Sequence, residues 1–115
     1  MKHSKLMYYT RDGRPTDDYD DCHPTGDFDR DMRVAKTQAG GYTISTVFLG
    51  FDHQFGDGPP LIFETMVFGD GPLDNECDRY PTEADAVEGH AKMVERCRTV
   101  QRFALADPSL TGDGK

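Results

Sequence analysis

Four short runs of apolar and β-branched residues occupy the first part of the chain. The runs at residues 42–49 and 61–68 are apolar at both odd and even positions, which is typical of strands in the middle of a sheet. Shorter runs at residues 5–10 and 32–38 also favour strands, and the glycine pair at 40–41 predicts a hairpin. The pattern therefore predicts a mostly antiparallel sheet of three to four strands.

A long helix is predicted over residues 82–104, with Thr82 as its N-cap after Pro81. Apolar residues recur there at spacings of three and four, which predicts one buried stripe facing the sheet. The predicted stripe consists of Ala84, Val87, Ala91, Val94 and Cys97. His90 borders this stripe, and Gly89 would let the helix approach the sheet closely. One C-terminal helix packed against such a sheet gives an α+β fold.

The length of 115 residues fits a single domain, which we place at residues 1–107. Residues 69–80 are rich in Gly, Pro and Asp and are predicted to be loop. Residues 15–31 form an acidic segment with two interpretations, a mobile flank or a short helical turn capped by Thr16. Residues 108–115 are predicted to be a disordered tail.

Acidic residues outnumber Lys and Arg by 21 to 13, and the formal net charge is −8. A surface of this sign repels nucleic acid and anionic membrane, because phosphate binding needs clustered cations. It suits a protein that docks onto a basic partner surface. No apolar run approaches the roughly 20 residues of a membrane span, and no signal peptide is visible. Because the three cysteines show no CxxC spacing, we expect reduced thiols and a cytoplasmic location.

The loop between the two central runs, Gly50 to Pro60, concentrates polar and aromatic groups in a connection held by two strands. A histidine beside a carboxylate can act as a general base, a ligand-binding donor or a metal ligand. Aromatic rings with a few cations are the usual chemistry for holding a nucleotide, although phenylalanines beside buried strands can equally be core. The candidate ligand-binding residues are Phe51, Asp52, His53, Gln54, Phe55, Arg33, Arg79 and His90. For His90 the alternative is a satisfied, half-buried side chain.

Residues for covalent or metal chemistry do not follow a recognisable pattern. There is no Gly-x-Ser-x-Gly elbow, and Cys77 is surrounded by acids that make a thiol a poor nucleophile. The alternating acids Asp27, Asp29 and Asp31 lack the glycine and the closing glutamate of a calcium loop. Zinc-ligand spacing is missing as well. We therefore expect no catalytic residues, no metal and no cofactor, and a protein that is not an enzyme.

The acidic segment offers a second candidate site, a protein-docking surface. Its residues are Asp17, Asp18, Asp20 and Asp21. Carboxylates in a row can mimic the phosphates of a nucleic acid for a basic host protein. The alternative is a solvated flank that binds nothing.

A long string of specific residues runs from the second β-type run into the helix. It comprises Arg33-Val34-Ala35, Ser45-Thr46-Val47-Phe48-Leu49-Gly50, Asp52-His53, Phe55-Gly56, Gly58-Pro59-Pro60, Phe63-Glu64-Thr65-Met66, Arg79-Tyr80, Glu83-Ala84 and Gly89-His90. Through these residues, about 32–98, the chain resembles a family of small, mostly uncharacterised bacteriophage and prophage proteins with an STVFLGxDHxFGxGPPLIFETMVF-type signature. It departs from that family at Asp78, where an aromatic residue is usual, and at Pro81, where serine is usual.

The resemblance implies a phage- or prophage-encoded accessory protein that acts in the cytoplasm of the host bacterium. We expect it to counter bacterial defence by non-catalytic binding that sequesters a small anionic, nucleotide-type signal. One alternative is an acidic inhibitor that binds a host defence protein, as an anti-CRISPR protein or a nucleic-acid mimic would. Another is a small nucleotide-cleaving enzyme that uses His53 and His90. A homo-oligomer with a pocket shared between protomers fits the small size of the domain.

Overall fold

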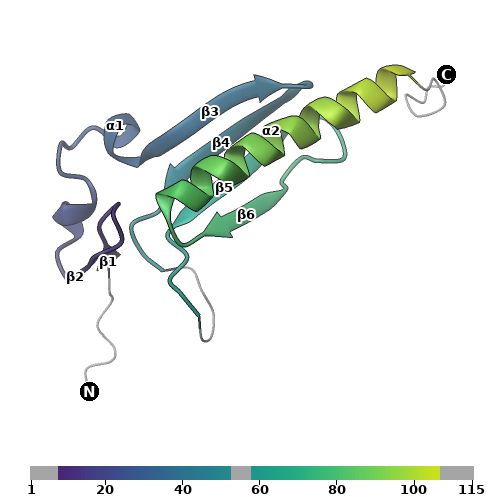
Figure 1. Cartoon of the computed structure of the whole chain (residues 1–115). Coiled ribbons are helices and arrows are strands. Elements are labelled where there is room, and N and C mark those ends of the chain that lie inside the picture. The colour runs from purple at the N-terminus through teal and green to yellow at the C-terminus, as the bar shows by residue number, and fades with distance from the viewer. Residues whose placement is uncertain (1–7, 53–57, 107–115) are drawn as a thin grey trace.

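The computed structural model describes residues 8–52 and 58–106, with side chains up to residue 100. Its main body is a four-stranded antiparallel sheet in the order β3-β4-β5-β6, with α2 lying across one face (Figure 1). The elements are β1 (Tyr8–Tyr9), β2 (Pro15–Thr16), the 3-10 helix η1 (Tyr19–Cys22), α1 (Phe28–Met32), β3 (Arg33–Ala39), β4 (Tyr42–Phe48), β5 (Phe63–Gly69), β6 (Cys77–Tyr80) and α2 (Glu83–Ala106). The predicted α+β fold, a small antiparallel sheet against one C-terminal helix, is confirmed.

β3 and β4 form the predicted hairpin around Gly40 and Gly41. Both glycines have positive φ, 60° and 85°, a backbone region that residues with a side chain adopt only under strain. β4 and β5 then pair with each other over all seven residues of each strand. The two runs predicted to be central strands are therefore the two strands in the middle of the sheet.

Two strands differ from the prediction. The expected loop over residues 69–80 is wrong at its end, because Cys77–Tyr80 pairs with β5 as strand β6. A four-residue strand that carries charged side chains shows no alternating pattern, so pairing with its neighbour decides its conformation. The run at residues 5–10 contributes Tyr8–Tyr9, which pairs with Pro15–Thr16 in a separate two-stranded ribbon. The part of that run before Tyr8 lies outside the described residues.

The acidic segment 15–31 contains β2, η1 and α1, and its own aspartates cap the two short helices. Asp18 accepts a hydrogen bond from a backbone amide at the start of η1, and Asp27 does so at the start of α1. The predicted helical turn is present, but its cap is Asp18 rather than Thr16. Short polar side chains that bond nearby amides explain how so acidic a stretch takes a defined backbone.

α2 begins behind the cap that the sequence predicts. The backbone amide of Asp85 donates to Oγ1 of Thr82 at 3.1 Å, which satisfies one of the free amides of the first turn. Glu83 and Asp85 carry carboxylates in that turn, and these negative charges interact favourably with the positive end of the helix dipole. The tail predicted at residues 108–115 lies outside the described residues.

The buried face of α2 differs from the predicted stripe by a rotation about the helix axis. Ala84, Val87 and Ala91 are exposed, and Val87 keeps 53% of its surface in solvent. The residues that α2 buries are Ala86, His90, Met93, Val94 and Cys97. Exposing an alanine costs little, whereas a histidine can be buried where its ring nitrogens find hydrogen-bond partners. His90 therefore lies at the centre of the buried face rather than at its border.

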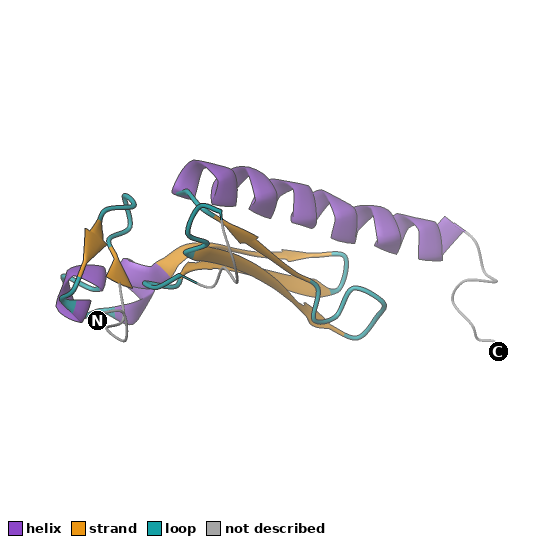
Figure 2. Ribbon diagram, turned by 90° about the horizontal axis from the view of Figure 1, so that it is seen from below, coloured by secondary structure: helices purple, strands orange, loops and turns teal. Residues whose placement is uncertain are grey.

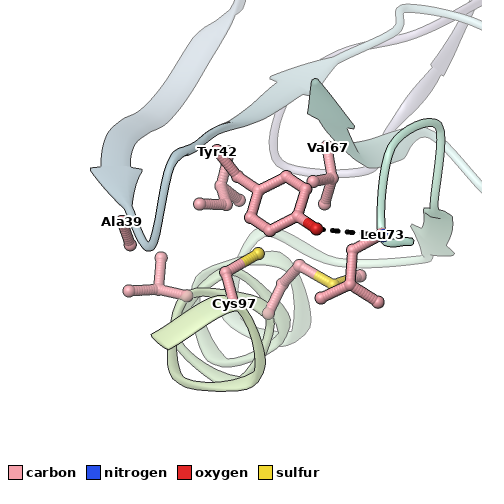
Figure 3. Close-up of a cluster of buried hydrophobic side chains, with 8 residues drawn as sticks. Ala39, Tyr42, Val67, Leu73 and Cys97 are labelled. Carbon is pink, nitrogen blue, oxygen red and sulfur yellow. Dashed lines mark hydrogen bonds between the residues drawn. The ribbon is translucent and has the colours of Figure 1, made fainter. Parts of the chain in front are cut away.

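The core consists of two apolar clusters with a polar layer between them. The first cluster contains Ala39, Tyr42, Ile44, Val67, Leu73, Met93, Val94 and Cys97 (Figure 3). The second contains Cys22, Met32, Phe48, Ile62, Phe63 and Ala86. Between the two, along β4, β5 and α2 respectively, lie the buried polar residues Thr46, Thr65 and His90.

Residues 8–32, here called the N-terminal unit, lie at one end of the sheet (Figure 2). The Tyr9 amide donates to the carbonyl of Gly50 at 2.8 Å. Next to this bond, Tyr8 pairs with Phe51 in an isolated antiparallel β-bridge. These contacts fix the N-terminal unit to the beginning of the loop that follows β4.

Candidate functional site

His90 lies in the polar layer between α2 and the sheet, with both ring nitrogens engaged. Its Nε2 lies 2.9 Å from Oγ1 of Thr37, and its Nδ1 lies 2.7 Å from Oγ1 of Thr46. The hydroxyl of Thr46 is in turn 2.5 Å from that of Thr65. Three adjacent strands thus contribute one threonine each to a hydrogen-bonded series, in which His90 of the helix bridges the threonine of β3 and that of β4.

The environment between α2 and the sheet keeps the His90 ring neutral and encloses it. Burial lowers the pKa of His90 below its ordinary value of 6.5, because an imidazolium would lose its hydration in the polar layer. A neutral imidazole donates through one nitrogen and accepts through the other, and threonine hydroxyls can take either role. With 7% of the residue exposed, the ring stabilises the core and does not face solvent.

The loop after β4 contributes two of the predicted ligand-binding residues to the described structure. Phe51 is 42% exposed. Oδ1 of Asp52 accepts a hydrogen bond from the Leu61 amide at 2.8 Å, so this carboxylate holds the two ends of the loop together. His53, Gln54 and Phe55 lie outside the described residues. Asp52 therefore has a structural task at the base of the loop.

Arg33 and Arg79 lie on the two edge strands of the sheet. Arg79 pairs in register with Glu64 and donates to its carboxylate at 3.0 Å. Successive residues of a strand point to opposite faces, so Glu64 and Arg79 face away from α2, and the sheet separates them from His90. Arg33 begins β3 and forms an ion pair with Asp29 at 3.2 Å. The structure does not bring these arginines and His90 into one pocket.

Three aromatic rings instead meet where the N-terminal unit joins the loop. The ring centroids of Tyr8 and Tyr19 lie 5.1 Å apart, and those of Tyr8 and Phe51 lie 6.4 Å apart. Tyr19 keeps 43% of its surface exposed and Phe51 keeps 42%. We call this set of three residues, from β1, η1 and the loop, the aromatic surface.

Exposed carboxylates border the aromatic surface, because the predicted docking aspartates belong to η1 and the turn before it. Asp18 caps η1 through Oδ1, and Asp21 accepts a hydrogen bond from Oγ1 of Thr16 at 2.6 Å. The side chain of Asp20 is 86% exposed. Asp17 precedes them and is also exposed. The acidic candidate residues thus lie on both sides of Tyr19 in sequence, two before η1 and two within it.

A cavity of about 920 Å³ opens in the N-terminal unit beside these carboxylates. Its charged lining residues are Arg11, Arg14, Arg30, Asp12, Asp20, Asp21 and Asp31. Two of the arginines are engaged, Arg11 by Glu83 and Arg14 by Asp12. A wall that mixes both signs in this way does not concentrate a multiply charged anion such as a nucleotide.

The sequence named Phe51 as a candidate ligand-binding residue and the aspartates as candidate docking residues, but it named neither Tyr8 nor Tyr19. Tyr8 lies in a run that resembles an ordinary strand, and Tyr19 stands alone among acids. An isolated aromatic residue in an acidic segment was the available signal, because such a segment has no core of its own to bury a ring. The meeting of Tyr8 with Phe51 depends on a pairing between distant segments.

Comparison of the chain with protein-family models, with curated proteins and with solved structures finds no match. Among residues 8–52 and 58–106, no three His, Cys, Asp or Glu side chains are grouped so as to hold a metal ion. No helix in the same part of the chain is both long and apolar enough to cross a membrane.

Proposed function

We propose that this chain is a non-catalytic binding protein that docks onto a basic surface of another protein. It would do so through the aromatic surface and the carboxylates of Asp18, Asp20 and Asp21, here called the η1 carboxylates. The observation that carries this proposal is the exposure of Tyr19 and Phe51, 43% and 42%, while both rings contact Tyr8. Aromatic side chains held in place contribute large contact area at low cost in conformational entropy, and they are enriched in protein interfaces.

The charge of the chain supports a basic partner. The formal net charge is −8, and Asp18, Asp20 and Asp21 are exposed within one turn. Complementary potentials steer the encounter of two proteins and exclude partners of the wrong sign. The combination of an apolar centre with a charged border is the usual composition of a transient interface.

The nucleotide-sequestering role draws less support from the geometry. His90 is enclosed between α2 and the sheet, and Arg33 and Arg79 are each paired with a carboxylate. A nucleotide site needs cations that outnumber the carboxylates around a common cavity, whereas the three arginines that line the cavity of the N-terminal unit share it with four aspartates. This geometry and the resemblance to phage and prophage proteins together lead us to propose that the partner is a host defence protein in the bacterial cytoplasm.

Site-specific photo-crosslinking tests this proposal. A benzoylphenylalanine at position 51 should crosslink to a Lys- or Arg-rich segment of another protein in the host bacterium. The same group at position 87, where Val87 is 53% exposed on the outer face of α2, is the matched control and should not. Equal crosslinking from both positions, or a stoichiometric nucleotide released when the purified protein is denatured, would overturn the proposal.

A charge-neutralised variant separates docking from folding. Asparagine remains a good helix cap, so Asp18→Asn, Asp20→Asn and Asp21→Asn remove three charges without removing the η1 cap. This variant should lose the crosslink from position 51. The control variant carries Asp70→Asn, Asp78→Asn and Glu88→Gln, which change the net charge equally at exposed sites elsewhere, and it should keep the crosslink. Loss in both variants would indicate a response to net charge alone and would contradict docking through the η1 carboxylates.

A further inference from the structure

We infer that the aromatic surface is a seat for an arginine side chain of the partner, with the guanidinium on Tyr19 or Phe51 and its N–H groups directed to the η1 carboxylates. This inference rests on the proposed function and names the chemical group that the surface recognises. It begins from the geometry of the three rings. Tyr8 and Tyr19 are inclined at 56°, and Tyr8 and Phe51 at 84°.

Inclined rings form a corner rather than a stacked column. In a stack, each inner face is covered by the next ring, whereas Tyr19 and Phe51 here both contact Tyr8 and still keep more than two fifths of their surface in solvent. The face of an aromatic ring is the negative part of its quadrupole and attracts a cation within about 6 Å of the centroid. A cation can therefore lie against the exposed part of Tyr19 or of Phe51.

Carboxylates stand beside the same ring. Tyr19 is flanked in sequence by Asp18 and Asp20, and all three are exposed. The cap hydrogen bond uses one oxygen of Asp18, Oδ1. The Asp20 side chain is 86% exposed. A ligand that lies on Tyr19 can therefore reach carboxylate oxygens without displacing the cap.

Arginine suits this combination better than lysine. The guanidinium is planar, so it can lie flat on an aromatic ring while its N–H groups donate in the ring plane to carboxylates. It is also weakly hydrated, which lowers the cost of bringing it against an apolar surface. The lysine ammonium is a strongly hydrated point charge that gains from the carboxylates but less from the rings.

One nitrogen-bearing ring of the protein already contacts Tyr19 near a carboxylate. The ring of His23 lies 4.6 Å from that of Tyr19, at an interplanar angle of 69°. Nε2 of His23 lies 3.9 Å from Oδ1 of Asp20. A nitrogen-bearing ring thus lies close to both Tyr19 and a carboxylate of the same turn, inclined to Tyr19 rather than flat on it. An incoming arginine would use the exposed remainder of Tyr19 or of Phe51.

Two peptides of equal length, one with six arginines and one with six lysines in the same Gly-Ser frame, provide the test. Their affinities for the full chain are compared by fluorescence anisotropy at one fixed ionic strength. The arginine peptide should bind more tightly by about two- to fivefold for each ring engaged. The variant with Tyr19→Leu and Phe51→Leu should lose that preference and change the affinity for the lysine peptide by less than about twofold. Phe68→Leu, at a ring that is 47% exposed on β5, is the control and should leave the preference intact.

The outcomes distinguish this inference from the proposed function. Equal affinity for the two peptides, or a preference that survives the double substitution, overturns the arginine seat while the crosslinks from position 51 still support docking. Absence of crosslinks overturns docking itself. The Asp18→Asn, Asp20→Asn, Asp21→Asn variant should weaken both peptides by similar factors, because it removes charge and leaves the rings. If the double variant fails to fold, Phe51→Leu alone should lower the preference by about two- to fivefold.

Discussion

Gly89 of α2 lies directly against the ring of Tyr80 on β6. A Cβ atom added at Gly89 would fall 2.3 Å from both Cε1 and the hydroxyl oxygen of Tyr80, far inside van der Waals contact. The helix can therefore cross β6 at this distance only because position 89 has no side chain. The sequence predicts the close approach at Gly89, although the apolar stripe that it predicts for the helix differs from the face that α2 buries.

The substitution Gly89→Ala should destabilise the protein by about 1–3 kcal/mol, the usual cost of overpacking. Helix propensity alone predicts the opposite, a gain of up to about 1 kcal/mol. Urea denaturation gives the sign directly. Glu88→Ala, on the exposed neighbouring position, should change the unfolding free energy by less than about 0.5 kcal/mol. Tyr80→Leu should relieve part of the Gly89→Ala penalty, and a Gly89→Ala variant more stable than the parent would refute the contact.

The threonine chain around His90 should be sensitive to the loss of a single hydroxyl. Thr46→Val leaves Nδ1 of His90 and the hydroxyl of Thr65 without the bonds they now make. Burying such unsatisfied groups costs about 1–3 kcal/mol in unfolding free energy. Thr43→Val, on the same strand but facing the other side of the sheet, removes an exposed hydroxyl bonded to Gln38 and should cost less than about 0.5 kcal/mol. Equal losses of unfolding free energy in the two variants would argue against a special role of the buried threonine hydrogen bonds.

The helix illustrates what the sequence could predict. Its N-cap at Thr82 and its position in the chain followed from local rules, because capping depends on residues within one turn. Its buried face did not follow, because alanine is nearly indifferent to burial and histidine is buried only where partners exist. Those partners, Thr37, Thr46 and Thr65, come from three strands, and no helical periodicity contains them.

The aromatic surface depended on tertiary contacts in the same way. The loop after β4 attracted attention because of its composition, and Phe51 does lie at the candidate site. Tyr8 reaches Phe51 through a β-bridge between segments far apart in sequence, which no local pattern encodes. β6 was missed for a related reason, since four residues with two charged side chains form a strand only when β5 is beside them.

Stability should decline as the pH falls below 6.5 because of His90. Its folded pKa is lowered by burial, so the unfolded chain takes up the proton first, and acid favours unfolding. The stabilisation that neutral His90 gives the folded protein is complete above the unfolded pKa of 6.5, and it is lost progressively as the pH falls toward the folded pKa. Urea titrations at pH values between about 8 and 5.5 measure the slope, and His90→Gln should flatten it. An unchanged slope in His90→Gln would assign the acid sensitivity to other groups.

Arg11 should hold the N-terminal unit, and with it the aromatic surface, in place. Its Nε and Nη2 donate to the two carboxylate oxygens of Glu83 at 2.9 and 3.0 Å, which joins the turn after β1 to the first turn of α2. The same guanidinium donates to the backbone carbonyls of Asp31 and Arg33, both at 3.1 Å. Lysine offers three donors from a single point and cannot span these four acceptors.

Arg11→Lys should therefore loosen the N-terminal unit while leaving the main sheet intact. Hydrogen exchange of the Tyr9 amide, which bonds to Gly50, should accelerate, whereas exchange within β4 and β5 should not change. The shift in global unfolding free energy should stay below about 1 kcal/mol, because both partners of the ion pair are partly exposed. Arg14→Lys is the matched control, since its exposed partner Asp12 lies in the same short turn. If the Tyr9 amide exchanges at the parent rate in Arg11→Lys, the contacts of Tyr8 and Tyr9 with Gly50 and Phe51 hold the unit without Arg11, and peptide affinity should then be unaffected.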